Sequence, residues 1–89
     1  MRIKNGFELR EMCGEHIIIA TGVANIDFSK VVSLNESAAW LWQQIEGQEF
    51  TPEVLAALLM EEYDVDEATA LADARNLAHL WIREGVVAE

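Results

Sequence analysis

The chain has 89 residues and carries 16 acidic side chains against six lysines and arginines, which gives a formal charge of −10 at pH 7. Chains of this length form one domain, so we expect a single domain over residues 1–89. The hydrophobic fraction of 52% is typical of a globular fold. The negative charge disfavours binding to nucleic acid or anionic membranes, because such binding depends on clustered cations.

No apolar run approaches the ~18 residues that span a bilayer, and the N-terminal residues lack the apolar core of a secretory signal. Cys13 is the single cysteine, which excludes an internal disulfide and fits a reducing compartment. These features predict a soluble cytoplasmic protein.

Residues 7–34 show the pattern of short β-strands. Apolar and charged residues nearly alternate over 7–12, as in a half-buried strand, and Gly14 suits a tight turn over 13–15. The β-branched run at 16–20 predicts a central strand covered on both faces. Residues 21–29 predict a loop and residues 30–34 a third strand. On that strand, Val32 and Leu34 should face the core, while Val31 and Ser33 point the other way.

From residue 35 onward the apolar spacing becomes helical. Asn35 is a suitable N-cap, and Gly47 predicts the end of the first helix. Thr51 followed by Pro52 predicts a second helix that ends near residue 63. Asp64 or Asp66 should cap a third, longest helix that runs to about residue 84. The periodicity predicts buried positions in the first, second and third helices and in the C-terminal tail: Ala38, Leu41, Trp42 and Ile45; Val54, Leu55, Leu58 and Leu59; Ala70, Leu71, Ala74, Leu77, Ala78 and Trp81; Val86 and Val87.

The element order is therefore βββααα. It predicts an α+β fold in which a three-stranded antiparallel sheet is followed by a three-helix bundle, a winged-helix-like arrangement.

The side chains that could carry chemistry are few. Cys13 and His16 flank the predicted turn, whereas His79 lies on the last helix, and no spacing typical of a zinc site or a nucleophile–base pair occurs. The acidic residues at 61–67 lack the glycine and the fifth-position ligand of a calcium loop. No phosphate-binding glycine motif is present. We therefore expect no catalytic residue, no metal and no cofactor.

Two other features could serve binding. Trp40 lies about 200° around the first helix from Trp42, so it either packs locally or forms an exposed anchor for a partner, and both interpretations stay open. The strand at 30–34 could form a border of the sheet, where unpaired main-chain groups can accept an added strand. Most such borders bind nothing.

The run from Val32 to Trp42, closed by Gly47, forms the end of a strand and a first helix with a small-residue pair and a Leu-Trp pair. This run resembles the first-helix signature of the PqqD family. Further similar segments are residues 7–10, 62–66, 70–73 and 85–87, so the resemblance spans roughly residues 7–87.

The resemblance implies a role in making ribosomally synthesised, modified peptides. Members of this family, also called RiPP recognition elements, bind the leader of a precursor peptide and deliver it to a modifying enzyme. In the founding pathway the product is the cofactor pyrroloquinoline quinone, and the enzyme is a radical SAM protein. The resemblance implies a fold of three strands and three helices. It also implies that the leader adds to the third strand, in the groove beside the third helix.

Carried onto this chain, the resemblance implies a strand wall of Lys30, Val31, Val32 and Ser33. For the helix wall we expect, from periodicity alone, one i, i+3, i+4, i+7 stripe: Ala72, Arg75, Asn76 and His79. Val31 and Ala72 would leave room for apolar leader side chains, and Lys30 and Arg75 could pair with acidic ones.

The expected partners are thus a leader peptide and a radical SAM maturase, with no nucleic acid and no membrane. The protein is expected to be a monomer or a strand-exchanged dimer. A winged-helix DNA-binding or regulatory domain and an unrelated protein–protein adaptor remain as alternatives. The scarcity of cations on the third helix, Arg75 and Arg83, disfavours DNA binding.

Overall fold

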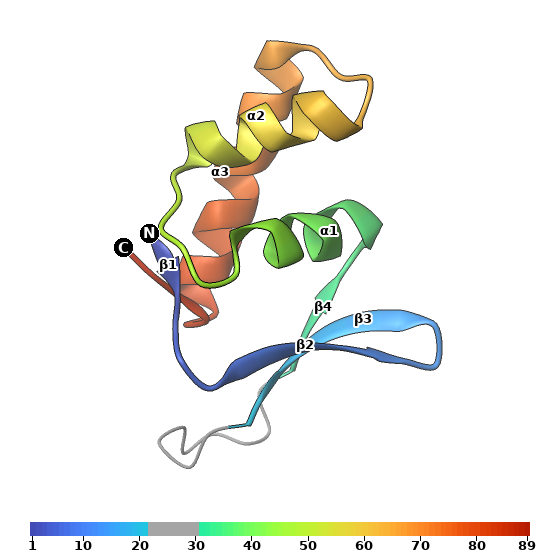
Figure 1. Ribbon diagram of the computed structural model, residues 1–89, viewed down its shortest axis with the longest axis vertical. Helices are drawn as coiled ribbons and strands as arrows, with labels where there is room; N and C mark the ends of the chain where they lie inside the picture. The colour runs from blue at the N-terminus through green and yellow to red at the C-terminus, as the bar shows by residue number, and fades with distance from the viewer. Residues whose placement is uncertain (22–30) are drawn as a thin grey trace.

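The computed structural model describes residues 1–21 and 31–89, and its main sheet has three antiparallel strands in the order β2-β3-β4 (Figure 1). The strands are β2 (Phe7–Met12), β3 (Glu15–Ala20) and β4 (Val31–Leu34). Three helices follow: α1 (Glu36–Ile45), α2 (Pro52–Glu62) and α3 (Glu67–Arg83). The α+β class and the βββααα order are confirmed. In Figure 1, α1 lies between α2 and the sheet, and α3 crosses behind α1 and α2.

The β2–β3 hairpin turns through two residues. Met12 pairs with Glu15, and Cys13 and Gly14 between them have φ values of 54° and 79°. Positive φ at both central residues is the type I′ geometry, whose twist matches that of the flanking strands. The predicted turn is confirmed at Gly14, while Glu15 belongs to β3.

One face of the sheet carries the core and the other does not. Leu9, Ile18 and Val32 lie in one cross-strand row on the helix side, and Ile18 and Val32 are buried. The next row, Glu8, Ile19 and Val31, lies on the opposite face. The alternation predicted for β4 is confirmed. The expectation that the central strand is covered on both faces is wrong, because Ile17 and Ile19 on the outer face are only half-buried.

Each of the three helices begins directly after a residue whose side chain accepts a hydrogen bond from the first turn. Asn35 Oδ1 accepts from the Ala38 amide at 2.8 Å, and Thr51 Oγ1 accepts from the Val54 amide at 3.2 Å. Asp66, one of the two predicted caps, accepts from the Thr69 amide at 2.7 Å. Satisfying these otherwise unpaired amides stabilises each helix start.

The core is built around two tryptophans. Trp42 on α1 meets Trp81 on α3 edge to face, with ring centroids 5.2 Å apart and planes at 87°, and Phe50 adds a second edge contact to Trp81. Such geometry stabilises aromatic pairs beyond their buried area. Trp81 Nε1 is buried without an acceptor among the described residues. On α3, the side chains of Ala70, Ala74 and Ala78 are fully buried, so α3 packs closely against its neighbours.

Some predicted core positions are less buried than expected. Val54 is 42% exposed, because α2 turns its opposite side, with Ala56, toward the core. Leu58, Leu71 and Leu77 are half-buried.

The two ends of the described chain form a second, two-stranded antiparallel sheet, β1 (Arg2–Ile3) with β5 (Val87–Ala88). The Lys4 amide donates to Val86 O at 3.0 Å, and the Phe50 amide donates to Met1 O at 2.8 Å. Val86 and Val87 are buried, as predicted, but the pairing itself was not expected. No helix within residues 1–21 and 31–89 has the length and apolar content that a bilayer span needs.

Candidate functional site

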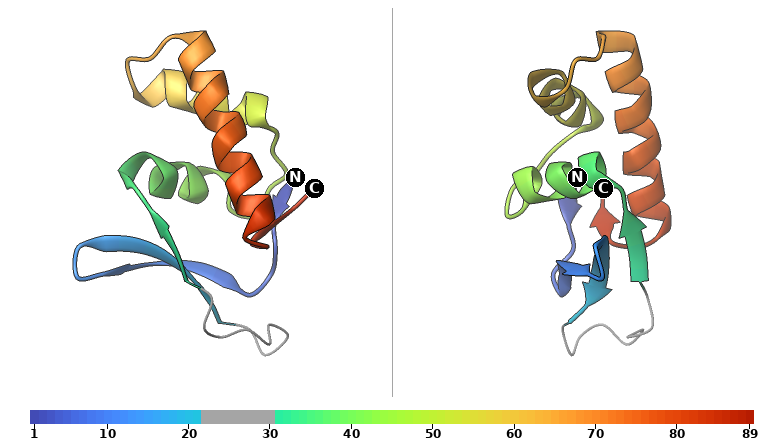
Figure 2. Two further views of the ribbon diagram at one scale, coloured as in Figure 1. Left: turned by 180° about the vertical axis from the view of Figure 1, so that it is seen from behind. Right: turned by 90° about the vertical axis from the view of Figure 1, so that its right-hand side faces the viewer.

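β4 is the border strand of the main sheet. It pairs with β3 along one side, in the register Ile18 opposite Val32, and no other described strand pairs with its second side. In the right-hand view of Figure 2, β4 stands on the side of the sheet nearest to α3. A border strand presents main-chain donors and acceptors that can form a ladder with an added strand. Among the described residues, the second side of β4 therefore has no strand partner, and it lies on the α3 side of the sheet.

The side chains of β4 divide the strand into an anchored and an accessible half. Val32 and Leu34 are 5% and 8% exposed and hold the strand to the core, whereas Val31 is 53% exposed and Ser33 is also exposed. An added strand would thus lie beside a rigidly packed template. Of the predicted strand wall, Val31, Val32 and Ser33 belong to β4, and Lys30 lies outside the described residues.

A groove begins where β4 ends. Asn35, the residue after β4, lines two neighbouring cavities of about 350 and 400 Å³ that also share Ser37, Leu59 and Asp73. We call the two cavities together the α1–α3 groove. The first cavity is further lined by Ala38, Leu41, Asn76, Leu77 and Leu80, and the second by Glu36, Tyr63 and Val65.

The helix wall of this groove differs from the expected stripe. Asn76 lines it, as predicted. Ala72, Arg75 and His79 are exposed and do not line it. At about 100° per residue, these three positions lie on the side of α3 turned away from its buried alanines. His79 instead borders a separate hollow that includes Met1 and Glu89.

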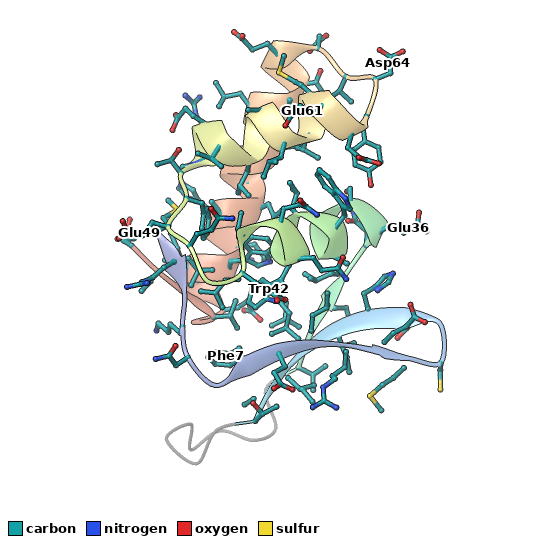
Figure 3. All side chains as sticks on the ribbon, in the orientation of Figure 1. Phe7, Glu36, Trp42, Glu49, Glu61 and Asp64 are labelled. Carbon is teal, nitrogen blue, oxygen red and sulfur yellow. The ribbon has the colours of Figure 1, made fainter. Side chains whose placement is uncertain are left out.

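The groove combines an apolar floor with acidic side chains on its two walls. Leu59 and Leu77 contribute to the floor, while Glu36 on α1 and Asp73 on α3 are exposed carboxylates. Figure 3 shows Glu36 where β4 passes into α1. No described lysine or arginine lines either cavity. Among the described residues, neither carboxylate has a cation within ion-pair distance. The electrostatic potential in the groove is therefore negative.

The candidate metal ligands do not come together. Cys13 is exposed in the β2–β3 turn, His16 Nδ1 lies 3.8 Å from Glu11 Oε2 on the neighbouring strand, and His79 is on α3. Within the described ranges, no three His, Cys, Asp or Glu side chains form a group that could hold a metal ion.

The resemblance implied a groove between the third strand and the third helix, whereas no residue of β4 lines either cavity of the α1–α3 groove, which begins at the residue after that strand. The family model for coenzyme PQQ synthesis protein D (PqqD) matches residues 15–87. The chain belongs to the PqqD family.

The solved structure of TbiB1 in complex with the TbiA(beta) leader peptide has the same fold as this PqqD-family chain. The two superpose with a TM-score of 0.75 over 100% of each chain, at 17% sequence identity. At this identity the match shows the fold alone. A comparison with curated proteins finds no significant match.

Sequence reasoning missed most of the groove of this PqqD-family chain. Asp73, Leu77 and Leu80 share the groove side of α3, and Tyr63 lines the second cavity. The signal available was the i, i+4, i+7 spacing of residues 73, 77 and 80, a stripe that mixes a charge with two leucines. Trp40, left open between packing and anchoring, is half-buried and meets Tyr63 edge to face with centroids 6.1 Å apart. Packing therefore accounts for it.

Proposed function

We propose that this protein is a non-catalytic chaperone that binds the leader of a ribosomally made precursor peptide. The leader adds as a strand to the open side of β4 and places side chains in the α1–α3 groove. The observation that carries the proposal is the side of β4 that no other described strand pairs with, together with the groove that begins at the next residue, Asn35. The leader-bound state of TbiB1, which has the same fold, supports it.

In this proposal the bound leader is presented to a radical SAM maturase in the cytoplasm, where precursor peptides are made, and the protein acts as a monomer or a strand-exchanged dimer. The PqqD family membership supports this assignment, which includes the synthesis of pyrroloquinoline quinone or a related peptide modification. The protein itself contributes binding and orientation, and the maturase contributes the chemistry.

Main-chain pairing accounts for affinity and the groove for selectivity. Each added hydrogen bond contributes about 0.5–1.5 kcal/mol net, so a short ladder along the four residues of β4 supplies several kcal/mol. Because Val32 and Leu34 are already fixed in the core, little conformational entropy is lost on the protein's side when the peptide binds.

The alternative of a DNA-binding domain meets an electrostatic objection. The cations of α3, Arg75 and Arg83, stand among Glu67 and Asp73 of the same helix and its C-cap Glu84, on a chain with a formal charge of −10. Since phosphate contacts supply most of the affinity for DNA, a gel shift at low salt should show no complex.

The test is an NMR titration of the ¹⁵N-labelled protein with the precursor leader encoded beside its gene. Shifts should concentrate on residues 31–35 of the strand edge and 73–80 of α3. Two N-methylated leaders provide the control, one methylated on the amides facing β4 and one on the amides between them. The first should lose about tenfold or more in affinity, because two or more ladder bonds are removed. Equal binding of both leaders would refute strand addition.

A further inference from the structure

We infer that the α1–α3 groove selects a basic residue of the bound peptide, a lysine or arginine whose head group meets Asp73. This inference rests on the proposed function and specifies the class of peptide. It replaces the expectation that Lys30 and Arg75 pair with acidic residues of the leader peptide. Arg75 does not line the groove, and Lys30 lies outside the described residues.

The position of Asp73 carries the inference. Its side chain lines both cavities, so it stands at the middle of the groove rather than at one end. Glu36 lies on the α1 side of the second cavity, and the two carboxylates therefore belong to opposite walls. A cation in this cavity is attracted from both sides, whereas an acidic peptide residue would meet like charge from both.

The floor of the groove fits the rest of a basic side chain. Leu59 lines both cavities, and Leu77 and Ala38 extend the apolar lining of the first. Lysine and arginine bury their methylene stems against apolar surface while the charged head stays in water. The exposed carboxylate of Asp73 allows this, because the head group pairs without full desolvation.

The side-chain oxygen of Asn35, which also lines both cavities, is already engaged by the protein. Asn35 Oδ1 already accepts from the Ala38 amide at 2.8 Å and from Ser37 Oγ at 3.0 Å. These bonds hold Asn35 in its capping position. Asp73 and Glu36 are the acidic residues that line the groove, and their carboxylates are the groups that can receive a charged donor.

The net negative charge of the protein attracts any cationic peptide. The experiment therefore has to separate the attraction by Asp73 from the attraction by the net charge. Glu49 provides the matched control. It is exposed on the connection between α1 and α2, and Figure 3 shows it on the opposite side of the molecule from Glu36. Asp73→Lys and Glu49→Lys change the net charge equally.

The probe is a library of short random peptides displayed on their own mRNA and selected on the immobilised protein. The wild type and Glu49→Lys should enrich Lys or Arg at one fixed place relative to an apolar strand segment. Asp73→Lys should lose that preference or enrich Asp and Glu there. The same basic preference in all three proteins would overturn the inference.

A double-mutant cycle between the peptide and Asp73 completes the test with substitutions that remove charges rather than reverse them. Replacing the enriched Lys of a selected peptide by Gln should weaken binding to the wild type up to about fivefold, and binding to Asp73→Asn by about twofold or less. Equal losses would overturn the inference. A selected peptide that shifts the β4 amides without any basic preference leaves the proposed function intact and refutes the inference alone. Peptides that bind without touching β4, or no enriched peptide at all, refute the proposed function.

Discussion

Replacing Asn35 by alanine tests how the end of β4 is joined to the start of α1. The Asn35 side chain closes the first turn of α1 through the Ala38 amide, and the same residue lines both cavities of the α1–α3 groove. Asn35→Ala removes the acceptor but keeps the main chain. We therefore expect the substitution to weaken both the fold and the binding of the leader peptide.

The expected loss of stability follows from removing the N-cap hydrogen bond. Losing an Asn N-cap costs about 1 kcal/mol, with a range of roughly 0.5–2 kcal/mol. For a domain of this size, that change lowers Tm by about 4–8 °C. The total free energy of unfolding of such a domain is about 5–13 kcal/mol, so the variant remains folded at room temperature. Any loss of affinity can then be measured on folded protein.

The assay compares thermal and urea unfolding, followed by circular dichroism, for Asn35→Ala, Asn35→Ser and Thr51→Ala. Serine restores an N-cap acceptor and should recover most of the stability. Thr51 caps α2 in the same way, through the Val54 amide at 3.2 Å, but lines neither cavity of the groove. Thr51→Ala should therefore lose similar stability and keep its affinity for the leader.

Two results would refute this reasoning. If Asn35→Ser unfolds at the same temperature as Asn35→Ala, the lost acceptor is not the cause of the destabilisation. If Thr51→Ala weakens leader binding as much as Asn35→Ala does, the effect on affinity reflects general stability rather than the position of Asn35 in the groove.

Two further predictions concern local structure. Cys13→Asn should raise the free energy of unfolding by about 0.5–1 kcal/mol in urea denaturation, because Cys13 has φ 54° and Asn-Gly is the preferred type I′ pair; a lower urea midpoint would contradict it. The Thr69 amide and hydroxyl hold the pKa of Asp66 below its usual 3.8. The stabilisation by the ionised Asp66 is therefore complete above about pH 3.8 and is lost as the pH falls through the lower, folded-state pKa. Asp66→Asn, which keeps a neutral cap, should show a smaller loss of stability on acidification below that pH, and an unchanged acid transition would count against the cap as its source.

The local elements could be predicted because each depends on neighbours in the chain. The caps at Asn35, Thr51 and Asp66 and the turn at Gly14 satisfy amides or dihedral angles within three residues. The pairing of β1 with β5 joins opposite ends of the described chain. No local pattern specifies such a pairing, because two-residue strands carry almost no periodicity of their own.

In the groove, too, the sequence predicted the local pattern but not the long-range packing. Periodicity identified the buried stripe of α3 correctly at Ala70, Ala74, Ala78 and Trp81. It could not tell which flank of that stripe faces α1 and which faces solvent, since the two flanks are symmetric about the buried face.

The sequence by itself determined that this chain forms three strands and three helices around an apolar core, that it is strongly acidic, and that it belongs with the PqqD family. The tertiary structure alone decided which flank of α3 meets the start of α1, and so placed Asp73 rather than Arg75 in the groove. The reason is physical. A helix specifies its buried face through its own residues, but the direction in which it crosses its neighbours depends on how all the packed surfaces fit together.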